Sequence, residues 1–249
     1  GTGDFATLQG ASDWIPQNNT LRRTITILPG VYHDFAIFTQ NRNYVTVIGG
    51  GSSWQDVQFI YPNAAYTSGS SCGLLRVESS DMYFRNLTLD NQVYLTNSLD
   101  NYGPWAGRLN TLDTTGQRLI FDHVMIKGGQ DTLYTISGSA YFNHCEIWGS
   151  VDFIYGNALS VFDQCNIVEI RDSGGPCTAP HTDYDQPYGL VFLNCNFPQA
   201  RIADGYPYDV KNGSTVFMRP WGQDGNTAII NCSVGNQMTT KGWSEWSGR

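Results

Sequence analysis

Two short strings in the sequence each place one carboxylate in a stretch that is otherwise largely apolar and flanked by glycine. They cover residues 128–134 (GGQDTLY) and 149–157 (GSVDFIYGN), and their carboxylates belong to Asp131 and Asp152, 21 residues apart. Two carboxyl groups that share one site cannot both ionise easily, so their pKa values split into an acid and a base or nucleophile. Whether these two carboxylates meet depends on the repeat period of the chain.

A short pattern recurs along the chain, with about 20 residues between its most closely spaced copies. Each copy begins with an apolar residue, which is followed in order by an aromatic residue or Ile, a variable residue, a short polar residue and often Cys. Apolar and polar residues then alternate. The copies occupy residues 83–89, 120–126, 141–147, 161–167, 191–197 and 229–234. The phenylalanines of the first five copies are 37, 21, 20 and 30 residues apart. A constant unit with variable extra length is typical of a solenoid with inserted loops.

Each copy is short and alternating, which predicts a β-strand. No window predicts a long amphipathic helix, although residues 11–14 indicate a short helical turn near the start. Strands that recur at this period without intervening helices predict an all-β fold, the parallel β-helix. The alternative is a β-sandwich with strands every 8–12 residues or so. It fits less well with four cysteines at one position of the repeat, namely Cys145, Cys165, Cys195 and Cys232.

The composition indicates one domain over residues 1–249, because no Pro/Ser-rich linker or charge block divides the chain. No apolar run approaches the ~20 residues that span a membrane, and no signal peptide is visible, so Gly1 resembles a mature or trimmed terminus. The net charge of −8 with three lysines argues against nucleic acid as a partner. A neutral or esterified polymer fits this charge better.

Six cysteines occur without a C-x-x-C pair, so a zinc or redox site has little support. Stacked coils could bring neighbouring members of the four-cysteine set within disulfide range. We expect at least one disulfide, which would indicate an oxidising environment. The alternative is a ladder of buried free thiols, since Cys packs as a small hydrophobe.

Eight short motifs follow one another in an order and spacing that identify a family resemblance. They lie at residues 3–5, 29–34, 45–49, 86–91, 130–133, 152–156, 219–221 and 242–246. Together they cover nearly the whole chain, which resembles the pectin methylesterases (pectinesterases, carbohydrate esterase family 8). These enzymes remove methyl groups from methylated polygalacturonate. The resemblance implies a right-handed parallel β-helix with loops that form a substrate cleft on one face. One departure is Asp34, where the family signature has Glu.

The resemblance also implies roles for four residues. Asp152 would be the nucleophile that attacks the methyl ester, and Asp131 the general acid and then the general base. Arg219 would hold Asp152 in bidentate geometry and keep it ionised. Gln130 would donate a hydrogen bond to the oxyanion. This chemistry requires no metal and no organic cofactor.

The chain departs from the family at the second oxyanion glutamine. Counting back from Gln130 by the family interval of 22 residues gives Arg108. Arg108 could donate to the oxyanion, or pair with a free carboxylate of the substrate. The oxyanion hole could also be impaired, which typically costs ~10²–10³ in rate per lost donor, or the enzyme could act on another ester.

Aromatic side chains commonly line sugar-binding clefts, because sugar rings have apolar faces. The candidates for the cleft wall are Trp221, Phe153, Tyr134 and Trp246, and core packing is the alternative for each. The four histidines indicate neither a Ser-His-Asp triad nor a metal cluster. His123 and His144, 21 residues apart, are expected to stack as ladder residues.

The sequence therefore predicts a secreted, periplasmic or cell-wall esterase that acts as a monomer on methylated homogalacturonan. Three alternatives remain open. The first is an esterase or thioesterase of the same fold with a different ester substrate or impaired activity, which Arg108 would explain. The second is a non-catalytic, carbohydrate-binding β-helix. The third is a lyase or a glycosidase, since a glycosidase also needs two carboxylates.

Overall fold

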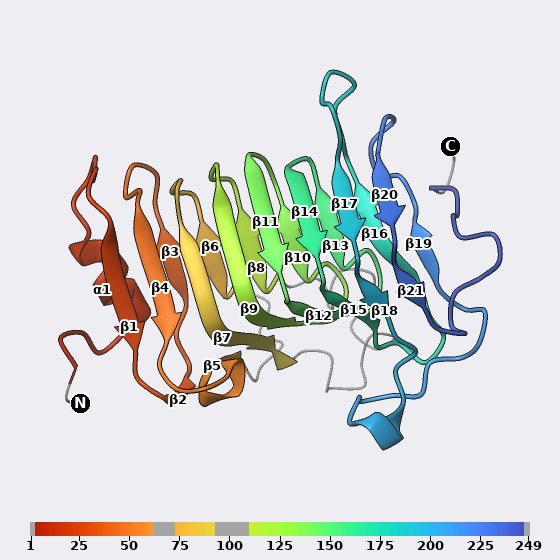
Figure 1. The fold of residues 1–249 in the computed structure, drawn as a ribbon, viewed down its shortest axis with the longest axis horizontal. Coiled ribbons are helices and arrows are strands. Elements are labelled where there is room, and N and C mark those ends of the chain that lie inside the picture. The colour runs from red at the N-terminus through yellow and green to blue at the C-terminus, as the bar shows by residue number, and fades with distance from the viewer. Residues whose placement is uncertain (1–2, 62–72, 93–109, 247–249) are drawn as a thin grey trace.

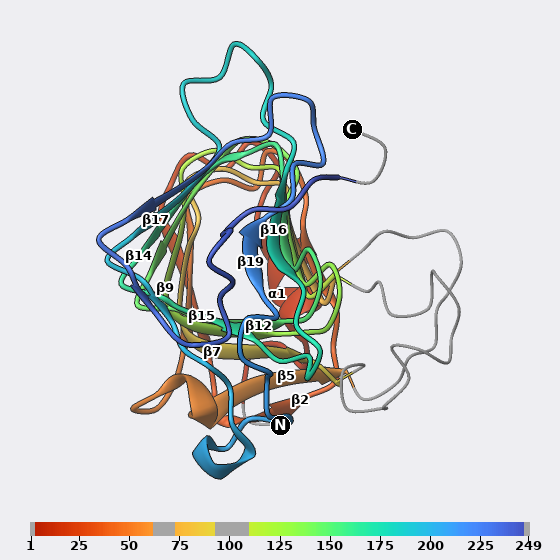
Figure 2. The same cartoon turned by 90° about the vertical axis from the view of Figure 1, so that its right-hand side faces the viewer.

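The chain forms a right-handed parallel β-helix, seen from the side in Figure 1 and end-on in Figure 2. The structure, a computed structural model, describes residues 3–61, 73–92 and 110–246. In Figure 2 the chain advances toward the viewer while turning anticlockwise, which makes the coil right-handed. The predicted all-β fold is confirmed.

Two parallel sheets make up the coil walls. The 14-stranded sheet contains β1 (Arg23–Ile27), β2 (Gly30–Tyr32), β4 (Val45–Gly49), β5 (Val57–Tyr61), β7 (Tyr83–Asn91), β9 (Leu119–Lys127), β11 (Ser139–Asn143), β12 (Glu146–Gly149), β14 (Leu159–Asp163), β15 (Asn166–Glu169), β17 (Leu190–Leu193), β18 (Asn196–Phe197), β20 (Thr227–Ile230) and β21 (Ser233–Val234). The seven-stranded sheet contains β3 (Ala36–Phe38), β6 (Leu75–Val77), β8 (Leu112–Thr114), β10 (Leu133–Thr135), β13 (Ile154–Gly156), β16 (Pro176–Pro180) and β19 (Val216–Met218).

Helices are short and peripheral in the described part of the chain. They are α1 (Leu8–Trp14) and the single turns η1 (Trp54–Asp56) and η3 (Ile202–Asp204). The helical turn expected at residues 11–14 is present but begins earlier, because the side chain of Thr7 caps the helix by accepting from the amide of Gly10 at 3.0 Å. None of the described helices is long and apolar enough to cross a membrane.

The repeat sets the register between coils. Phe121 pairs with Phe142, which pairs with Phe162, which pairs with Phe192, so the phenylalanines of the sequence pattern stack directly. Their rings lie nearly parallel with centroids 4.6–4.9 Å apart, and all four are fully buried. Each coil exposes its apolar inner face until a neighbour covers it, so this aromatic stack forms the centre of the core.

A column of bends, called here the corner column, joins the phenylalanine-bearing strand segments to the segments that follow. Its members are Asn86, His123, His144, Gln164, Asn194 and Asn231. All six have a left-handed backbone with φ between 49° and 54°. Asparagine tolerates this conformation better than most residues, which explains its recurrence at the bend.

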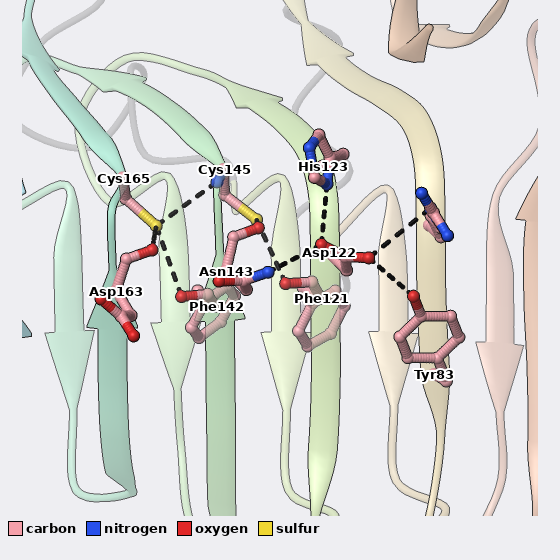
Figure 3. A network of polar contacts seen from close by, with 10 residues as sticks. Tyr83, Phe121, Asp122, His123, Phe142, Asn143, Cys145, Asp163 and Cys165 are labelled. Atoms are coloured by element: carbon pink, nitrogen blue, oxygen red, sulfur yellow. Dashed lines mark hydrogen bonds and ion pairs between the residues drawn. The ribbon is translucent and has the colours of Figure 1, made fainter. Parts of the chain in front are cut away.

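The expected disulfide is not formed among the cysteines that the structure describes. Cys145, Cys165, Cys177, Cys195 and Cys232 are all free. Neighbouring thiols instead lie beside backbone groups: the sulfur of Cys165 accepts from the amide of Cys145 at 3.4 Å (Figure 3). In-register stacking keeps neighbouring Cβ atoms about 4.8 Å apart, whereas a disulfide needs about 3.8 Å. The ladder of buried thiols is therefore the arrangement present, and Cys72 lies outside the described residues.

Candidate active site

Asp131 and Asp152 occupy the same bend in two adjacent coils. Each lies two residues before a strand of the seven-stranded sheet, and the register pairs Leu133 with Ile154. Both aspartates have a left-handed backbone, with φ of 61° and 51°. The amide of Asp131 donates to the carbonyl of Val151 at 3.1 Å, which ties the two bends together. The 21-residue spacing therefore does place the two acidic residues in neighbouring turns.

Arg219 holds the carboxylate of Asp152 with two hydrogen bonds. Its Nε donates to Oδ1 at 2.8 Å and its Nη2 donates to Oδ2 at 2.5 Å. The Asp152 side chain is only 6% exposed and that of Arg219 is 27% exposed. A bidentate, charge-assisted pair of this kind favours the ionised carboxylate. The same hydrogen bonding to Asp152 raises the pKa of Arg219, although burial opposes it.

Asp131 lies close enough to affect two groups electrostatically. Its charge adds to the raised pKa of Arg219. It also adds to the raised pKa of Tyr155, for which burial is the main cause. Asp131 and Asp152 therefore share one electrostatic environment, and Asp131 is half-buried whereas Asp152 is buried.

Gln130 directly precedes Asp131 in the same bend and is half-buried. Arg108, the residue found where the family has a second glutamine, lies outside the described residues.

Aromatic rings gather beside the dyad. Tyr134 and Tyr155 stack in parallel with centroids 4.2 Å apart, each three residues after its aspartate. The ring of Trp221 lies 6.4 Å from Tyr134 and 6.0 Å from Tyr155. Trp246 packs against Arg219, whose Cζ lies 4.5 Å from the ring centroid. The structure thus brings Tyr134, Trp221 and Trp246 together around the dyad.

The expectation that Phe153 lines a cleft is wrong. Its side chain is fully buried and belongs to the main hydrophobic core. It packs so closely on Gly149 that a Cβ atom added to this glycine would lie 2.0 Å from the Phe153 Cβ atom. The chain turns at Asp152, so the next side chain points into the coil rather than outward.

A hydrogen-bonded chain that the sequence analysis missed extends from Tyr155. Its hydroxyl donates to Oδ1 of Asn110 at 2.9 Å, and Nδ2 of Asn110 donates to Oδ1 of Asp113 at 2.6 Å. The amide of Gly73 donates to Oδ2 of Asp113 at 3.0 Å. Asp113 is fully buried, and this burial raises its pKa to about 6.

A signal for this chain of contacts was present in the sequence. The strings NTLD at residues 110–113, DTLY at 131–134 and DFIY at 152–155 occupy the same positions of three successive coils. Aligning the first string with the two aspartate-bearing strings would have identified Asn110 and Asp113 as neighbours of the site.

Side chains of the types that can bind a metal ion lie close together at a place away from the dyad. Among the described residues, one group of at least three His, Cys, Asp or Glu side chains has its possible ligand atoms close together. It consists of Asp122, His123 and His144. The two histidine rings stack as expected, with centroids 5.0 Å apart and an interplanar angle of 5°. The participation of Asp122 was not anticipated.

Comparisons with known proteins agree with this geometry. A family model described as Pectinesterase matches residues 1–249. Pectinesterase QRT1 of Arabidopsis thaliana is 31% identical over 256 residues, which cover 99% of this chain and 63% of that protein. The chain thus spans less than two thirds of the length of this relative.

Solved structures share the fold. A pectin methylesterase from carrot superposes with a TM-score of 0.84 at 24% identity, covering 100% of this chain and 75% of that chain. A pectin methylesterase in complex with a hexasaccharide superposes with a TM-score of 0.78 at 25% identity, covering 97% and 77%. With the family model matched from end to end, the chain belongs to the pectinesterase family.

Proposed function

We propose that this protein is a pectinesterase that hydrolyses the methyl esters of methylated homogalacturonan and releases methanol. The observation that carries the proposal is the pairing of Asp152 with Arg219 in the coil next to Asp131. Membership of the pectinesterase family supports the reaction. The structural neighbour that binds a hexasaccharide supports a polysaccharide substrate.

The first half of the proposed reaction forms an acyl-enzyme. An oxygen of the Asp152 carboxylate attacks the carbonyl carbon of the methyl ester, and a tetrahedral oxyanion forms. The bond from carbon to the methoxy oxygen then breaks while Asp131, in its protonated form, gives its proton to that oxygen. Methanol leaves, and the galacturonyl group remains joined to Asp152 as an anhydride.

The second half restores the enzyme. Asp131, now a carboxylate, takes a proton from a water molecule whose oxygen attacks the galacturonyl carbonyl carbon. The anhydride bond to Asp152 breaks, Asp152 leaves as a carboxylate, and a free galacturonate carboxyl group is released. Asp131 ends the cycle protonated, so one ester and one water give one acid and one methanol.

Arg219 and Gln130 would prepare the site for these steps. Arg219 fixes both oxygens of Asp152, so the nucleophile is held in one orientation and stays charged. Gln130 is proposed to donate to the oxyanion from the bend beside Asp131. Arg108 is proposed to supply the second contact, either to the oxyanion or to a free carboxylate on the substrate.

The rings of Tyr134, Trp221 and Trp246 are proposed to contact the sugar residues. Tyr134 and Trp221 are half-buried beside the dyad, so part of each ring surface is available to a ligand. Sugar rings stack their apolar faces on such surfaces. We further propose that the protein works as a monomer outside the cell, where pectin occurs.

Methanol release is the direct test. The protein is incubated with highly methylated pectin, with sparsely methylated pectin and with acetylated, unmethylated polygalacturonate. The proposal expects methanol in proportion to the methyl-ester content and no acetate from the third substrate. Acetate release without methanol would show that the dyad serves a different ester, and release of neither would contradict the proposed reaction.

A further inference from the structure

A second cluster of polar side chains lies on the side of the coil away from the dyad. It is centred on Asp122 and His123 in β9 and on His144, which follows β11. Figure 2 shows β9 and β14 on one side of the coil and β16 and β19 on the other. The ligand atoms of the three side chains lie within 4.8 Å of one another. The reaction proposed above uses none of these residues.

Asp122 is the fixed centre of this cluster (Figure 3). Its Oδ2 accepts from the hydroxyl of Tyr83 at 2.7 Å and lies 3.5 Å from Nε of Arg85. Its Oδ1 accepts from Nδ2 of Asn143 at 2.9 Å and lies 2.7 Å from Nδ1 of His123. Burial opposes ionisation of Asp122, but the hydrogen bonds from Tyr83, His123 and Asn143 outweigh it and lower the pKa of this carboxyl.

The contact to Asp122 assigns the tautomer of His123. A carboxylate oxygen can only accept, so the Nδ1 atom of His123 must carry the proton that joins them. In the neutral ring the lone pair is then on Nε2. A histidine oriented by a carboxylate in this way is the usual arrangement at protein metal sites, where the carboxylate fixes the ring and increases its basicity.

His144 supplies a second imidazole from the next coil. The rings of His123 and His144 are parallel, and His144 is exposed while the side chain of His123 is 43% exposed. A tetrahedral ion with metal–nitrogen bonds of about 2.0–2.1 Å needs its two nitrogens roughly 3.4 Å apart. The two rings are parallel in the structure, so binding one ion requires them to turn until both lone pairs point at it, and their exposure to solvent leaves room for this turn.

We propose that His123 and His144 bind one divalent transition-metal ion of the zinc class, with Asp122 orienting His123 and supplying a neighbouring negative charge. Water completes the coordination shell. Imidazole nitrogen suits Zn²⁺, Ni²⁺ and Cu²⁺, whereas Ca²⁺ and Mg²⁺ prefer sets of oxygen ligands. Such an ion would join two successive coils at the corner column and so stabilise the folded state by binding to it.

The corner column itself provides matched variants. Three of its positions carry asparagine in the same left-handed conformation, Asn86, Asn194 and Asn231. His123→Asn and His144→Asn therefore replace each ligand by a residue that this bend already accepts. Gln164 follows His144 in the next coil, so Gln164→His adds a third imidazole to the ladder. His33 is exposed and lies outside the cluster, so His33→Asn is the control for non-specific binding.

The experiment is calorimetric titration of the chelator-treated full chain with ZnCl₂ and, separately, with CaCl₂. We expect one Zn²⁺ per chain, no heat from Ca²⁺, and a rise in melting temperature with Zn²⁺. Either His→Asn variant should lose at least about tenfold in affinity, and Asp122→Asn about 10- to 100-fold, as for other residues that support a ligand. Gln164→His should bind more tightly, and His33→Asn should be unchanged.

Two results would overturn the proposal. One is the absence of Zn²⁺ binding to the wild-type chain at millimolar metal, and the other is an unchanged affinity in His144→Asn. Methanol release is expected to be the same with and without Zn²⁺ and in both His→Asn variants, because these residues lie away from the dyad. Failure of the proposed metal site would therefore leave the proposed esterase reaction unaffected, and failure of the esterase reaction would leave the metal site unaffected.

Discussion

Two aspartates at equivalent positions of adjacent coils have different surroundings, and this difference supports the roles proposed for them. Asp152 is buried and held at both oxygens by Arg219, whereas Asp131 is half-buried. A nucleophile must stay ionised, and an acid must keep a proton. The bidentate guanidinium meets the first requirement for Asp152.

Arg219→Lys tests the geometry of this pair apart from its charge. Lysine keeps a positive charge but lacks the planar fork that holds both carboxylate oxygens. We expect kcat for methanol release to fall by roughly 10²-fold, with a smaller change in KM, since misplacing a reacting group costs about this much. An unchanged kcat would mean that charge alone suffices, and near-native circular dichroism serves as the control for folding.

Asp113 is a buried acid whose ionisation should oppose folding. Burial raises its pKa from 3.8 to about 6. An acid with a raised pKa in the folded state favours folding while it is protonated, and this contribution is lost as the pH rises through about 6. The shift corresponds to roughly 3 kcal/mol between pH 3 and pH 8.

Asp113→Asn removes this ionisation. The free energy of unfolding of both proteins is measured with urea. We expect the value for Asp113→Asn minus the value for the wild type to increase by about 1–3 kcal/mol from pH 4 to pH 8. The gain should develop mainly between pH 4 and pH 7. A difference between the two proteins that is independent of pH would contradict the assigned ionisation.

At the scale of elements, the stacked phenylalanines determine which strands pair. Phe121, Phe142, Phe162 and Phe192 keep one register through four coils, and loops of different length close each turn outside it. The alternation within each copy predicted the strands, and the recurrence of the copies without intervening helices predicted their parallel stacking into a coil.

Phe142→Ala should be costly because the ring is fully buried between two others. We expect a loss of about 3–5 kcal/mol in the free energy of unfolding. Ile120→Ala is the matched control, since Ile120 lies on the outer face of β9 and is 39% exposed. Its loss should be about 1 kcal/mol or less, and similar losses for both variants would contradict the proposed core.

The free cysteines of the described residues give a simple prediction about redox conditions. Because Cys145, Cys165, Cys177, Cys195 and Cys232 form no disulfide, a reducing agent has no cross-link among them to break. We expect the same melting temperature with and without dithiothreitol. A fall of several degrees on reduction would show that a disulfide contributes to stability.

The same elements show where sequence reasoning ends. The 21-residue step placed Asp131 and Asp152 correctly because a strand ladder transmits register from coil to coil. It could not decide which way Phe153 points, since the direction of that side chain depends on the bend at Asp152. Nor did it identify Asn110 and Asp113, whose contacts join three coils through side chains rather than through the backbone.

At the scale of the whole molecule, the coil separates two groups of polar residues. The dyad lies at the bends that lead into the seven-stranded sheet, and the histidine pair lies in the corner column on another side of the coil. Each group arises because equivalent positions of successive coils stack. A parallel β-helix thus places the proposed reactive pair and the proposed ligand pair at separate bends of the coil.

The central claim is that Asp152 carries the acyl group during ester hydrolysis, and the initial rate of methanol release by Asp152→Ala tests it most directly. With highly methylated pectin, we expect the wild type to release methanol steadily. The variant should release none above background while keeping the circular dichroism of the wild type. Methanol release at the wild-type rate by the folded variant would contradict the account.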